Sequence, residues 1–353
     1  MATMRAAVIH GLKEFRIEDV QKPEPQHGEI VIEVKCVTTC GTDVKSYLRG
    51  RPGDTYPRLF GHGEVAGVVH EVGEGVTKFN EGDRVTAHNS APCMECEACL
   101  RHKYMACENF HFETDNPTVP LGRGGYQEYY LVPERIVRLN TFKIPDHVPY
   151  EAACQLEPSC CAVYGSHLCQ TKPGDSVVIL GCGPQAIYHL QMQKMMGAIQ
   201  IIMTDKIDYR LQKAKEFGAD IVLNAAKVDV EEEIKRLTDG KGPDIVIEAV
   251  GTPATYEQAV RVVGKLGLVN EYAGAAPGAT VTFSAEKIHY GGITIVGTTH
   301  TTPYHTHLTW RLICAGRLNT KDVCTQKMPL EDLQKAFDIL TGPQTALKIG
   351  MIP

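Results

Sequence analysis

The sequence lacks three features that would set its class at once. It has no run of basic residues, and its 36 Lys and Arg against 42 Asp and Glu leave a formal charge of −6, which argues against nucleic acid or an anionic membrane as a partner. Its longest apolar stretches, such as residues 176–181, have the length of strands and fall far below the ~20 residues that span a bilayer. Residues 1–10 have neither the apolar core nor the cleavage site of a secretory leader. We therefore expect a soluble, cytoplasmic protein.

Internal repeats and low-complexity segments are absent as well, so the chain is an ordinary globular one. At 353 residues it is long enough for two domains with cores of their own. Its 33 glycines predict many turns, or places where the backbone comes close to a ligand.

Cysteine, in contrast, is plentiful. The count of 13 is odd, four of the residues form one tight run, and Cys160 and Cys161 are adjacent, which suits no simple disulfide framework. A reducing compartment fits this usage best, and there clustered thiolates are more often metal ligands than bridges.

The two parts of the chain differ in pattern. Up to about residue 140, β-branched runs separated by regular turns predict a small β-barrel or sandwich. From residue 173 strands and helices alternate, which predicts a parallel, doubly wound sheet. The six expected strands are 176–181, 199–205, 221–224, 244–250, 267–274 and 293–297. The tail, 300–353, is expected to return to the first domain.

A candidate dinucleotide site follows the first of these strands. The strand runs into Gly181-Cys182-Gly183-Pro184-Gln185-Ala186 and then a helix. Gly181 allows the tight turn, Gly183 lets a pyrophosphate approach the helix N-terminus, and Ala186 permits close helix–strand packing. Asp205 ends the next strand, where its carboxylate can bind ribose hydroxyls and repel a 2′-phosphate, so NAD is favoured over NADP.

A candidate structural metal site lies in a short lobe at about residues 90–110. Cys93, Cys96, Cys99 and Cys107 have the spacing C-x2-C-x2-C-x7-C. Four thiolates suit a closed tetrahedral zinc site. Iron–sulfur ligation and fortuitous clustering remain open as minor alternatives.

A third group is scattered along the chain. Each member also has an ordinary structural explanation. Cys40 could be a buried thiol, His62 a loop histidine, and Glu157 an exposed helix residue. Together with an NAD site they gain weight, because Cys, His and Glu can hold zinc through three protein ligands and leave one position open for a substrate.

These motifs resemble those of the zinc-dependent medium-chain dehydrogenases, the family of alcohol, sorbitol and threonine dehydrogenases. The likeness covers essentially the whole chain and is strongest to the polyol and threonine branch. It implies a GroES-like β-barrel catalytic domain over 1–151 and 299–353, and a Rossmann NAD-binding domain over 152–298. It also implies two zinc ions per chain and a homo-oligomer, either a dimer or a tetramer.

The resemblance assigns roles residue by residue. Cys40, His62 and Glu157 look like the ligands of a catalytic zinc, Thr42 like the hydroxyl that takes the substrate proton, and Asp43 like a partner that orients the ligating histidine.

Two positions depart from the family pattern. Gly63 is inserted between His62 and Glu64, where relatives have no residue, so either a bulge absorbs the insertion or the zinc site is distorted. We expect an intact site, with Glu64 as its least certain ligand. Lys45 stands where many relatives have a relay histidine, and either a proton relay or an exposed lysine is equally consistent.

Softer assignments complete the cofactor site. Arg210 is expected on the adenosine side of NAD, with Val250 and Thr298 beside the nicotinamide. The resemblance supplies no ligand role for His300, His305 and His307, which we expect in a strand segment at a cleft or interface.

The sequence thus predicts an NAD-dependent zinc dehydrogenase that interconverts a secondary hydroxyl of a polyol or sugar-like alcohol and the ketone. The alternatives are oxidation of threonine or of a simple secondary alcohol, or a protein that binds zinc and NAD without turnover. No nucleic acid or membrane partner is expected.

Overall fold

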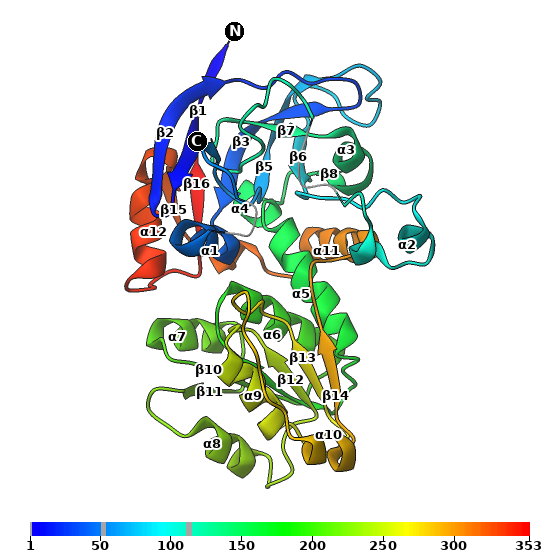
Figure 1. Ribbon diagram of the computed structural model, residues 1–353, viewed down its shortest axis with the longest axis vertical. Coiled ribbons are helices and arrows are strands. Elements are labelled where there is room, and N and C mark those ends of the chain that lie inside the picture. The colour runs from blue at the N-terminus through cyan, green and yellow to red at the C-terminus, as the bar shows by residue number, and fades with distance from the viewer. Residues whose placement is uncertain (1, 51–53, 111–114) are drawn as a thin grey trace. The chain divides into compact units, whose positions relative to one another are not determined.

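The computed structural model describes residues 2–50, 54–110 and 115–353, and the chain divides into two compact units. Unit 1 comprises Met1–Cys160 with Thr302–Pro353, and unit 2 comprises Cys161–Thr301. The expected boundaries were 151/152 and 298/299, so both divisions fall somewhat later along the chain. Figure 1 shows the elements of each unit.

Unit 1 is built on two sheets whose strands are mostly antiparallel. The smaller has the order β2-β1-β4, and the larger has the order β15-β16-β3-β5-β6-β8 with β7 paired to β3. Their core contains a cluster of aromatic rings, among them Phe15, Phe60, Tyr126 and Phe337. The strands are β1 (Thr3–Gly11), β2 (Glu14–Gln21), β3 (Ile30–Thr38), β4 (Arg58–Leu59), β5 (Val65–Val72), β6 (Arg84–Ala87), β7 (Tyr129–Val132), β8 (Thr141–Lys143), β15 (Cys324–Pro329) and β16 (Lys348–Ile352).

The tail returns to unit 1 through β16, which pairs with the end of β3. This pairing matters for the site, because it brings a segment near the C-terminus beside residues 38–40. The helices of unit 1 are α1 (Gly41–Arg49), α2 (Glu97–Leu100), α3 (Glu134–Asn140), α4 (Tyr150–Ala153), α11 (Pro303–Cys314) and α12 (Leu333–Thr341), with short 3-10 turns at Tyr104–Ala106, Lys321–Val323 and Leu330–Asp332. Helix α5 (Leu156–Leu168) begins in unit 1 and ends in unit 2.

The expectation of a strand segment for the tail histidines is wrong for two of them. His305 and His307 lie in α11, which starts at Pro303 because Thr302 caps it and proline suits the first helical position. His305 Nδ1 lies 2.7 Å from Thr302 Oγ1, and His307 Nε2 lies 3.0 Å from the Leu139 carbonyl oxygen. Both histidines therefore serve the local structure of the helix and its packing.

Unit 2 confirms the predicted doubly wound sheet. Its six strands are parallel and have the order β11-β10-β9-β12-β13-β14, which reverses direction at β9. Such a reversal opens a crevice at the carboxyl ends of the neighbouring strands, where nucleotides bind. The elements are β9 (Ser176–Leu180), α6 (Pro184–Met196), β10 (Gln200–Asp205), α7 (Asp208–Glu216), β11 (Ile221–Asn224), α8 (Val230–Leu237), β12 (Ile245–Glu248), α9 (Pro253–Val262), β13 (Leu268–Glu271), α10 (Ala285–Gly291) and β14 (Thr294–Gly297).

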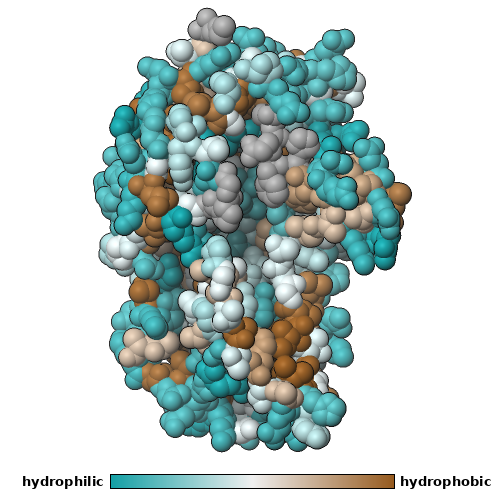
Figure 2. All heavy atoms as spheres, in the orientation of Figure 1, coloured by the Kyte–Doolittle hydropathy of each residue, from teal (hydrophilic) through white to brown (hydrophobic). Residues whose placement is uncertain are grey.

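The surface of the molecule is mostly polar on the face drawn in Figure 2, with smaller apolar patches. Among the described residues, no helix combines the length and the apolar character needed to cross a membrane.

Candidate functional site

Cys40 stands where β3 ends and α1 begins. Its backbone N–H donates to Asp43 Oδ2 at 3.0 Å, and its Sγ accepts from the backbone N–H of Thr42 at 3.4 Å, so Cys40 caps the helix. The hydroxyl of Tyr126 also donates to Asp43 Oδ2, at 2.7 Å. The Cys40 thiol therefore has a fixed place at the N-terminus of α1.

His62 lies in the loop between β4 and β5, flanked by two glycines. Gly61 and Gly63 have φ of +110° and +90°, a backbone conformation that residues with a side chain rarely adopt. The register shifts between β3 and β5 lie further along β5, so no strand bulge forms at Gly63. Gly63 is thus accommodated in the loop before β5, and a Cβ on Gly63 would meet Tyr130 Oη at 2.9 Å.

Glu64 is a buried carboxylate with a buried counter-charge. Its Oε2 accepts from Lys348 Nζ at 2.6 Å and from the Thr38 hydroxyl, and Lys348 Nζ also donates to the Thr39 carbonyl at 2.6 Å. The Glu64 side chain is 0% exposed and that of Lys348 3%. Its second oxygen, Oε1, is buried without a hydrogen-bond partner. A buried carboxylate oxygen without a donor is costly, unless a cation occupies the space beside it.

Three of the expected ligands converge. One ligand atom each from Cys40, His62 and Glu64 lies within 4.8 Å of the other two. Glu157, at the start of α5, has its Oε2 3.6 Å from His62 Nδ1, with its side chain 5% exposed. Sulfur, imidazole and carboxylate donors suit zinc, and the unpartnered Glu64 Oε1 is consistent with a metal at this place. The donor set therefore fits the ion.

The charged groups of this cluster shift one another's protonation. Burial acts to lower the pKa of His62, but the charges of Glu157 and Cys40 outweigh it and raise that pKa well above the usual value. Burial, followed by the charge of Glu64, raises the pKa of the Cys40 thiol. Burial also raises the pKa of Glu64, against the opposing charge of Lys348. The cluster thus depends on mutual charge compensation away from water.

The other residues expected near this site lie on α1. Thr42 is half-buried and Lys45 is exposed. Asp43 is buried, and its hydrogen bonds run to the Cys40 backbone and to Tyr126. In the part of the chain that the structure describes, Asp43 acts on the histidine only through space, so its direct role is to fix Cys40.

The four cysteines of the lobe also come together. Cys93, Cys96, Cys99 and Cys107 each offer a sulfur within 4.8 Å of the other three. The backbone N–H of Cys96 donates to Cys93 Sγ at 3.3 Å, and that of Cys93 donates to Cys107 Sγ at 3.3 Å. Backbone donors from Glu95 and Cys96 lower the pKa of Cys93 to about 6. N–H groups aimed at sulfur favour thiolates, the form that binds metal.

In unit 2 the glycine-rich turn is formed as expected. Gly181 has φ of +104°, and Gly183 precedes α6 with Pro184 at its first position. The Asp205 carboxylate accepts from the backbone N–H of Cys182 at 2.9 Å, which ties the end of β10 to this turn. Arg210 Nη1 lies 4.0 Å from Asp205 Oδ2. Backbone N–H groups at the start of α6 can receive a pyrophosphate.

The remaining cofactor residues lie near this edge of the sheet. Val250 follows β12 and is 46% exposed, and the Thr298 hydroxyl, after β14, donates to Asn270 Oδ1 at 2.8 Å. The Gln185 side chain accepts from the Tyr272 hydroxyl at 2.6 Å. Residues at the carboxyl ends of β10, β12 and β14 are thus available to a nucleotide.

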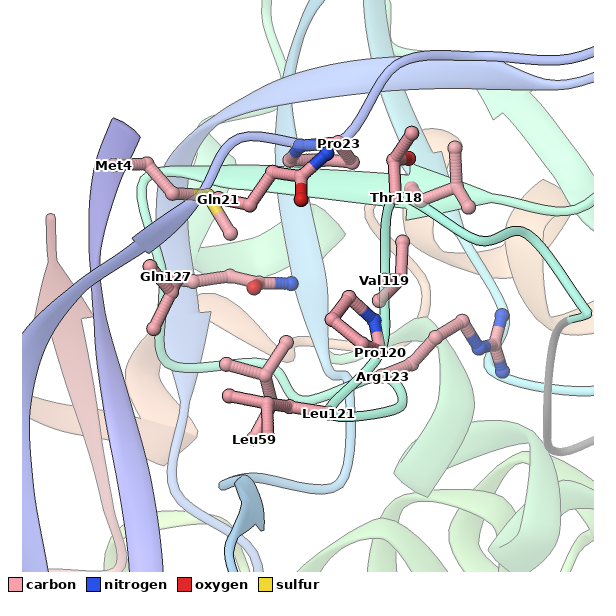
Figure 3. Close-up of a pocket in the computed structure, with 12 residues that line it drawn as sticks. Met4, Gln21, Pro23, Leu59, Thr118, Val119, Pro120, Leu121, Arg123 and Gln127 are labelled. Carbon is pink, nitrogen blue, oxygen red and sulfur yellow. The ribbon is translucent and has the colours of Figure 1, made fainter. Parts of the chain in front are cut away.

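A separate apolar pocket in unit 1 lies between β1, β4 and residues 118–123 (Figure 3). Its cavity measures about 30 Å³, whereas ligand sites usually measure hundreds. The pocket is too small to hold an alcohol of the expected class.

Comparison with known proteins supplies the family. Residues 26–146 match the alcohol dehydrogenase GroES-like domain, and residues 186–313 match the zinc-binding dehydrogenase domain. Sorbitol dehydrogenase of Bacillus subtilis is 32% identical over 99% of this chain and 97% of its own. L-Threonine 3-dehydrogenase of Pyrococcus furiosus is 32% identical over all of both chains. The chain belongs to the zinc-dependent medium-chain alcohol dehydrogenase family.

Solved structures of alcohol dehydrogenase relatives have the same fold. An oxidoreductase of unknown specificity from Escherichia coli superposes with a TM-score of 0.88, at 30% identity over 99% of each chain. The family match confirms both the GroES-like and the Rossmann domains, and it confirms that the chain is an enzyme of the zinc-type alcohol dehydrogenase class. Zinc and a nicotinamide nucleotide are the cofactors of this class.

Sequence reasoning missed three residues of the dehydrogenase site. Lys348 carries the counter-charge of Glu64, Asn89 contacts His62, and Tyr126 holds Asp43. Of these three, only Lys348 could have been recognised in the sequence. It begins a short apolar strand, where a buried charge needs a partner of opposite sign. Asn89 and Tyr126 come close through tertiary packing alone.

Proposed function

We propose that this protein is an NAD-dependent zinc dehydrogenase that interconverts a secondary alcohol of a polyol or sugar-like substrate and the corresponding ketone. The observation that carries the proposal is the convergence of Cys40, His62 and Glu64, with a buried lysine to balance the charge. The kinship with sorbitol dehydrogenase supports a polyol as the substrate class.

Two zinc ions per chain are part of this proposal. The catalytic ion would be held by donors from Cys40, His62, Glu64 and Glu157. The mutual distances of the first three support this assignment, as does the 3.6 Å between Glu157 Oε2 and His62 Nδ1. The structural ion would be held by Cys93, Cys96, Cys99 and Cys107. Of the two clusters, the one at Cys40, His62 and Glu64 has mixed donors, and the side chain of its ligand His62 is 17% exposed. A catalytic site needs such access for its substrate.

The catalytic roles of the side chains follow from their places. Bound zinc supplies a Lewis acid that lowers the pKa of the substrate hydroxyl. Thr42 receives the hydroxyl proton, and Lys45, one turn further along α1, is the next group toward solvent. NAD held at the Gly181–Ala186 turn would supply the two-electron acceptor for a hydride from the substrate carbon, and one proton would pass to water. Asp43 keeps Cys40 in place through its backbone N–H.

NAD is the proposed cofactor, and unit 2 would bind it. The Gly181–Ala186 turn would take the pyrophosphate, and Asp205 would accept from the ribose hydroxyls. A carboxylate here disfavours a 2′-phosphate. Arg210 Nη1 lies 4.0 Å from Asp205 Oδ2, so the guanidinium can pair with that carboxylate. Val250 and Thr298 would lie near the nicotinamide.

Threonine oxidation is the second candidate, because a threonine dehydrogenase is an equally identical relative. A zinc- and NAD-binding protein without turnover is the third. The reducing cytoplasm is the proposed location, because four clustered thiols suit metal ligation in a reducing compartment better than disulfides. A homo-oligomer is the proposed assembly.

The test is NADH formation by the purified protein with a panel of polyols, cyclitols, simple secondary alcohols and threonine, together with zinc analysis. Turnover concentrated on polyols, with two zinc ions per chain, is the expected result. Turnover on threonine alone would replace the first candidate with the second. Absence of turnover with only one zinc would show that the catalytic site does not form.

A further inference from the structure

Asn89 is buried beside the candidate metal cluster and has no role in the proposed mechanism. It follows β6 and is 3% exposed. Its Nδ2 donates to the His62 carbonyl oxygen at 2.9 Å, and the same nitrogen lies 3.4 Å from His62 Nε2 and 3.5 Å from His62 Nδ1. The amide of Asn89 therefore contacts both the backbone and the ring of one residue.

This contact fixes a loop that has little regular structure of its own. Residues 60–64 lie outside any helix or strand, and His62 stands between two glycines with positive φ. Glycine has the widest range of backbone conformations of any residue, so the two glycines alone do not fix the position of His62. A hydrogen bond to His62 therefore has a large effect on the direction of its ring. The donor from Asn89 supplies such an anchor.

Asn89 is itself held on its other side. The Arg123 guanidinium donates to the Asn89 carbonyl oxygen and lies 5.7 Å from the Tyr130 ring. Tyr130 is also the residue that a Cβ on Gly63 would strike, and Asn89 Cβ would lie 3.4 Å from that atom. Gly63 thus lies against both Asn89 and Tyr130, with little room for a side chain.

We propose that Asn89 is a positioning residue for the metal ligand His62, and that Gly63 gives the loop the room it needs to reach this anchor. The proposal rests on the proposed function, in which His62 binds the catalytic zinc. It explains how the chain tolerates an insertion beside a ligand. The anchor acts through His62, as groups that orient ligating histidines generally do.

The chain offers a matched control for the test. Asn140 is 2% exposed, and its Nδ2 donates to the Ser90 carbonyl oxygen at 2.9 Å, one residue away from Asn89. Asn89→Asp and Asn140→Asp therefore make the same chemical change, at the same bond length, on neighbouring parts of the backbone. Each puts a carboxylate oxygen against a carbonyl oxygen, but only Asn89→Asp acts on His62.

The experiment measures zinc retained per chain against increasing chelator, with NADH binding to each variant as a second readout. For Asn89→Asp we expect one zinc to be lost at a roughly 10-fold lower chelator concentration, with the second zinc and NADH binding unchanged. Asn140→Asp should keep both ions as tightly as the unaltered protein. Asn89→Ala, which adds no repulsion, should show the same loss to a smaller extent and serves if Asn89→Asp does not fold.

The opposing results are equally clear. Equal zinc loss in the Asn89 and Asn140 variants would mean that Asn89 has only a general structural role, and would overturn the proposal. So would zinc retention in Asn89→Asp and Asn89→Ala equal to that of the unaltered protein. If the unaltered protein holds only one zinc, the proposed function is wrong, and so is the role of Asn89 that depends on it. If the unaltered protein holds two zinc ions but the Asn89 variants lose none, only the role of Asn89 is wrong.

A second pair of variants examines the glycine. Gly63→Ala should weaken zinc retention, because its Cβ meets Tyr130 Oη and its φ is unfavourable. Gly63→Ala with Tyr130→Phe should regain part of it, since the clashing oxygen is gone. No loss in Gly63→Ala would overturn the part assigned to Gly63.

Discussion

Unit 1 and unit 2 assemble their candidate sites in different ways. In unit 2 the Gly181–Ala186 turn and Asp205 come from one strand–helix–strand stretch, and a hydrogen bond from the backbone N–H of Cys182 joins the two. In unit 1 Cys40, Glu64 and Lys348 come from segments far apart along the chain. They meet because β16 and β5 both pair with β3. A site of the first kind follows from local connectivity, whereas a site of the second kind needs the completed sheet.

The two units also differ in how they bury charge. Unit 1 sets Glu64 against Lys348, so opposite charges compensate. Unit 2 sets Glu271 beside Glu248 on neighbouring strands, so like charges adjoin. Glu248 accepts from the backbone N–H groups of Val250 and Gly251, while both oxygens of Glu271 are buried without a hydrogen-bond partner. The first arrangement is suited to ionised groups, and the second requires that one carboxyl keep its proton.

The largest expected effect removes the unit 1 site. Cys40→Ser should lower kcat/KM by at least about 10³-fold and release one zinc, because a serine hydroxyl is a poor zinc ligand at neutral pH. NAD binding by unit 2 should be unchanged. Zinc analysis and NADH formation check this result. The matched variant Cys99→Ser should release the other zinc, and Cys40→Ser with two zinc ions and full activity would refute the ligand assignment.

Next in size is the loss of the buried counter-charge. Lys348→Met should destabilise the protein by about 3–5 kcal/mol, because it leaves Glu64 buried and uncompensated. Denaturant unfolding measures the change. The double variant Lys348→Met with Glu64→Gln should regain much of the stability, since neither charge remains. Additive losses in the double variant would contradict the pairing.

The like-charge pair of unit 2 gives a pH-dependent prediction. Burial and the charge of Glu248 raise the pKa of Glu271 to about 8, from 4.5 in an unfolded chain. The folded state therefore keeps a proton that the unfolded state loses, and stability falls as the pH rises from about 4.5 to about 8. Glu271→Gln removes this loss and should stabilise the protein by about 4 kcal/mol at pH 8.

The stabilisation by Glu271→Gln should shrink toward zero near pH 4.5. Thermal unfolding of both proteins at several pH values measures it. A difference between the proteins that stays constant across pH would mean that Glu271 does not carry the proton.

The smallest expected effect concerns cofactor choice. Asp205→Ala should reduce the preference for NAD over NADP by about 10-fold, or roughly 1.4 kcal/mol, because the carboxylate no longer binds ribose or repels a 2′-phosphate. The ratio of kcat/KM for the two cofactors measures it. Asp208→Ala, an exposed carboxylate three residues further on, is the control and should leave the ratio unchanged.

Most of unit 2 could be predicted from the sequence. Each expected strand from β9 to β14 is present within three residues at either end, because buried parallel strands are short apolar runs bounded by turns. The tail of unit 1 was harder to predict. There His305 and His307 were expected in a strand, although Thr302 and Pro303 form a helix start that could have been recognised.

The sequence by itself determined the two-domain plan, the glycine turn with its acidic partner, and the cysteine lobe, because each depends on spacing within a few tens of residues. Only the tertiary structure decided that Glu64 lies with Cys40 and His62, that Lys348 balances its charge, and that Asn89 contacts the histidine. Those contacts depend on strand pairing and loop packing between distant segments. The number of residues between two such segments does not fix their distance in space, because loops of many different lengths can connect the same two positions in the fold.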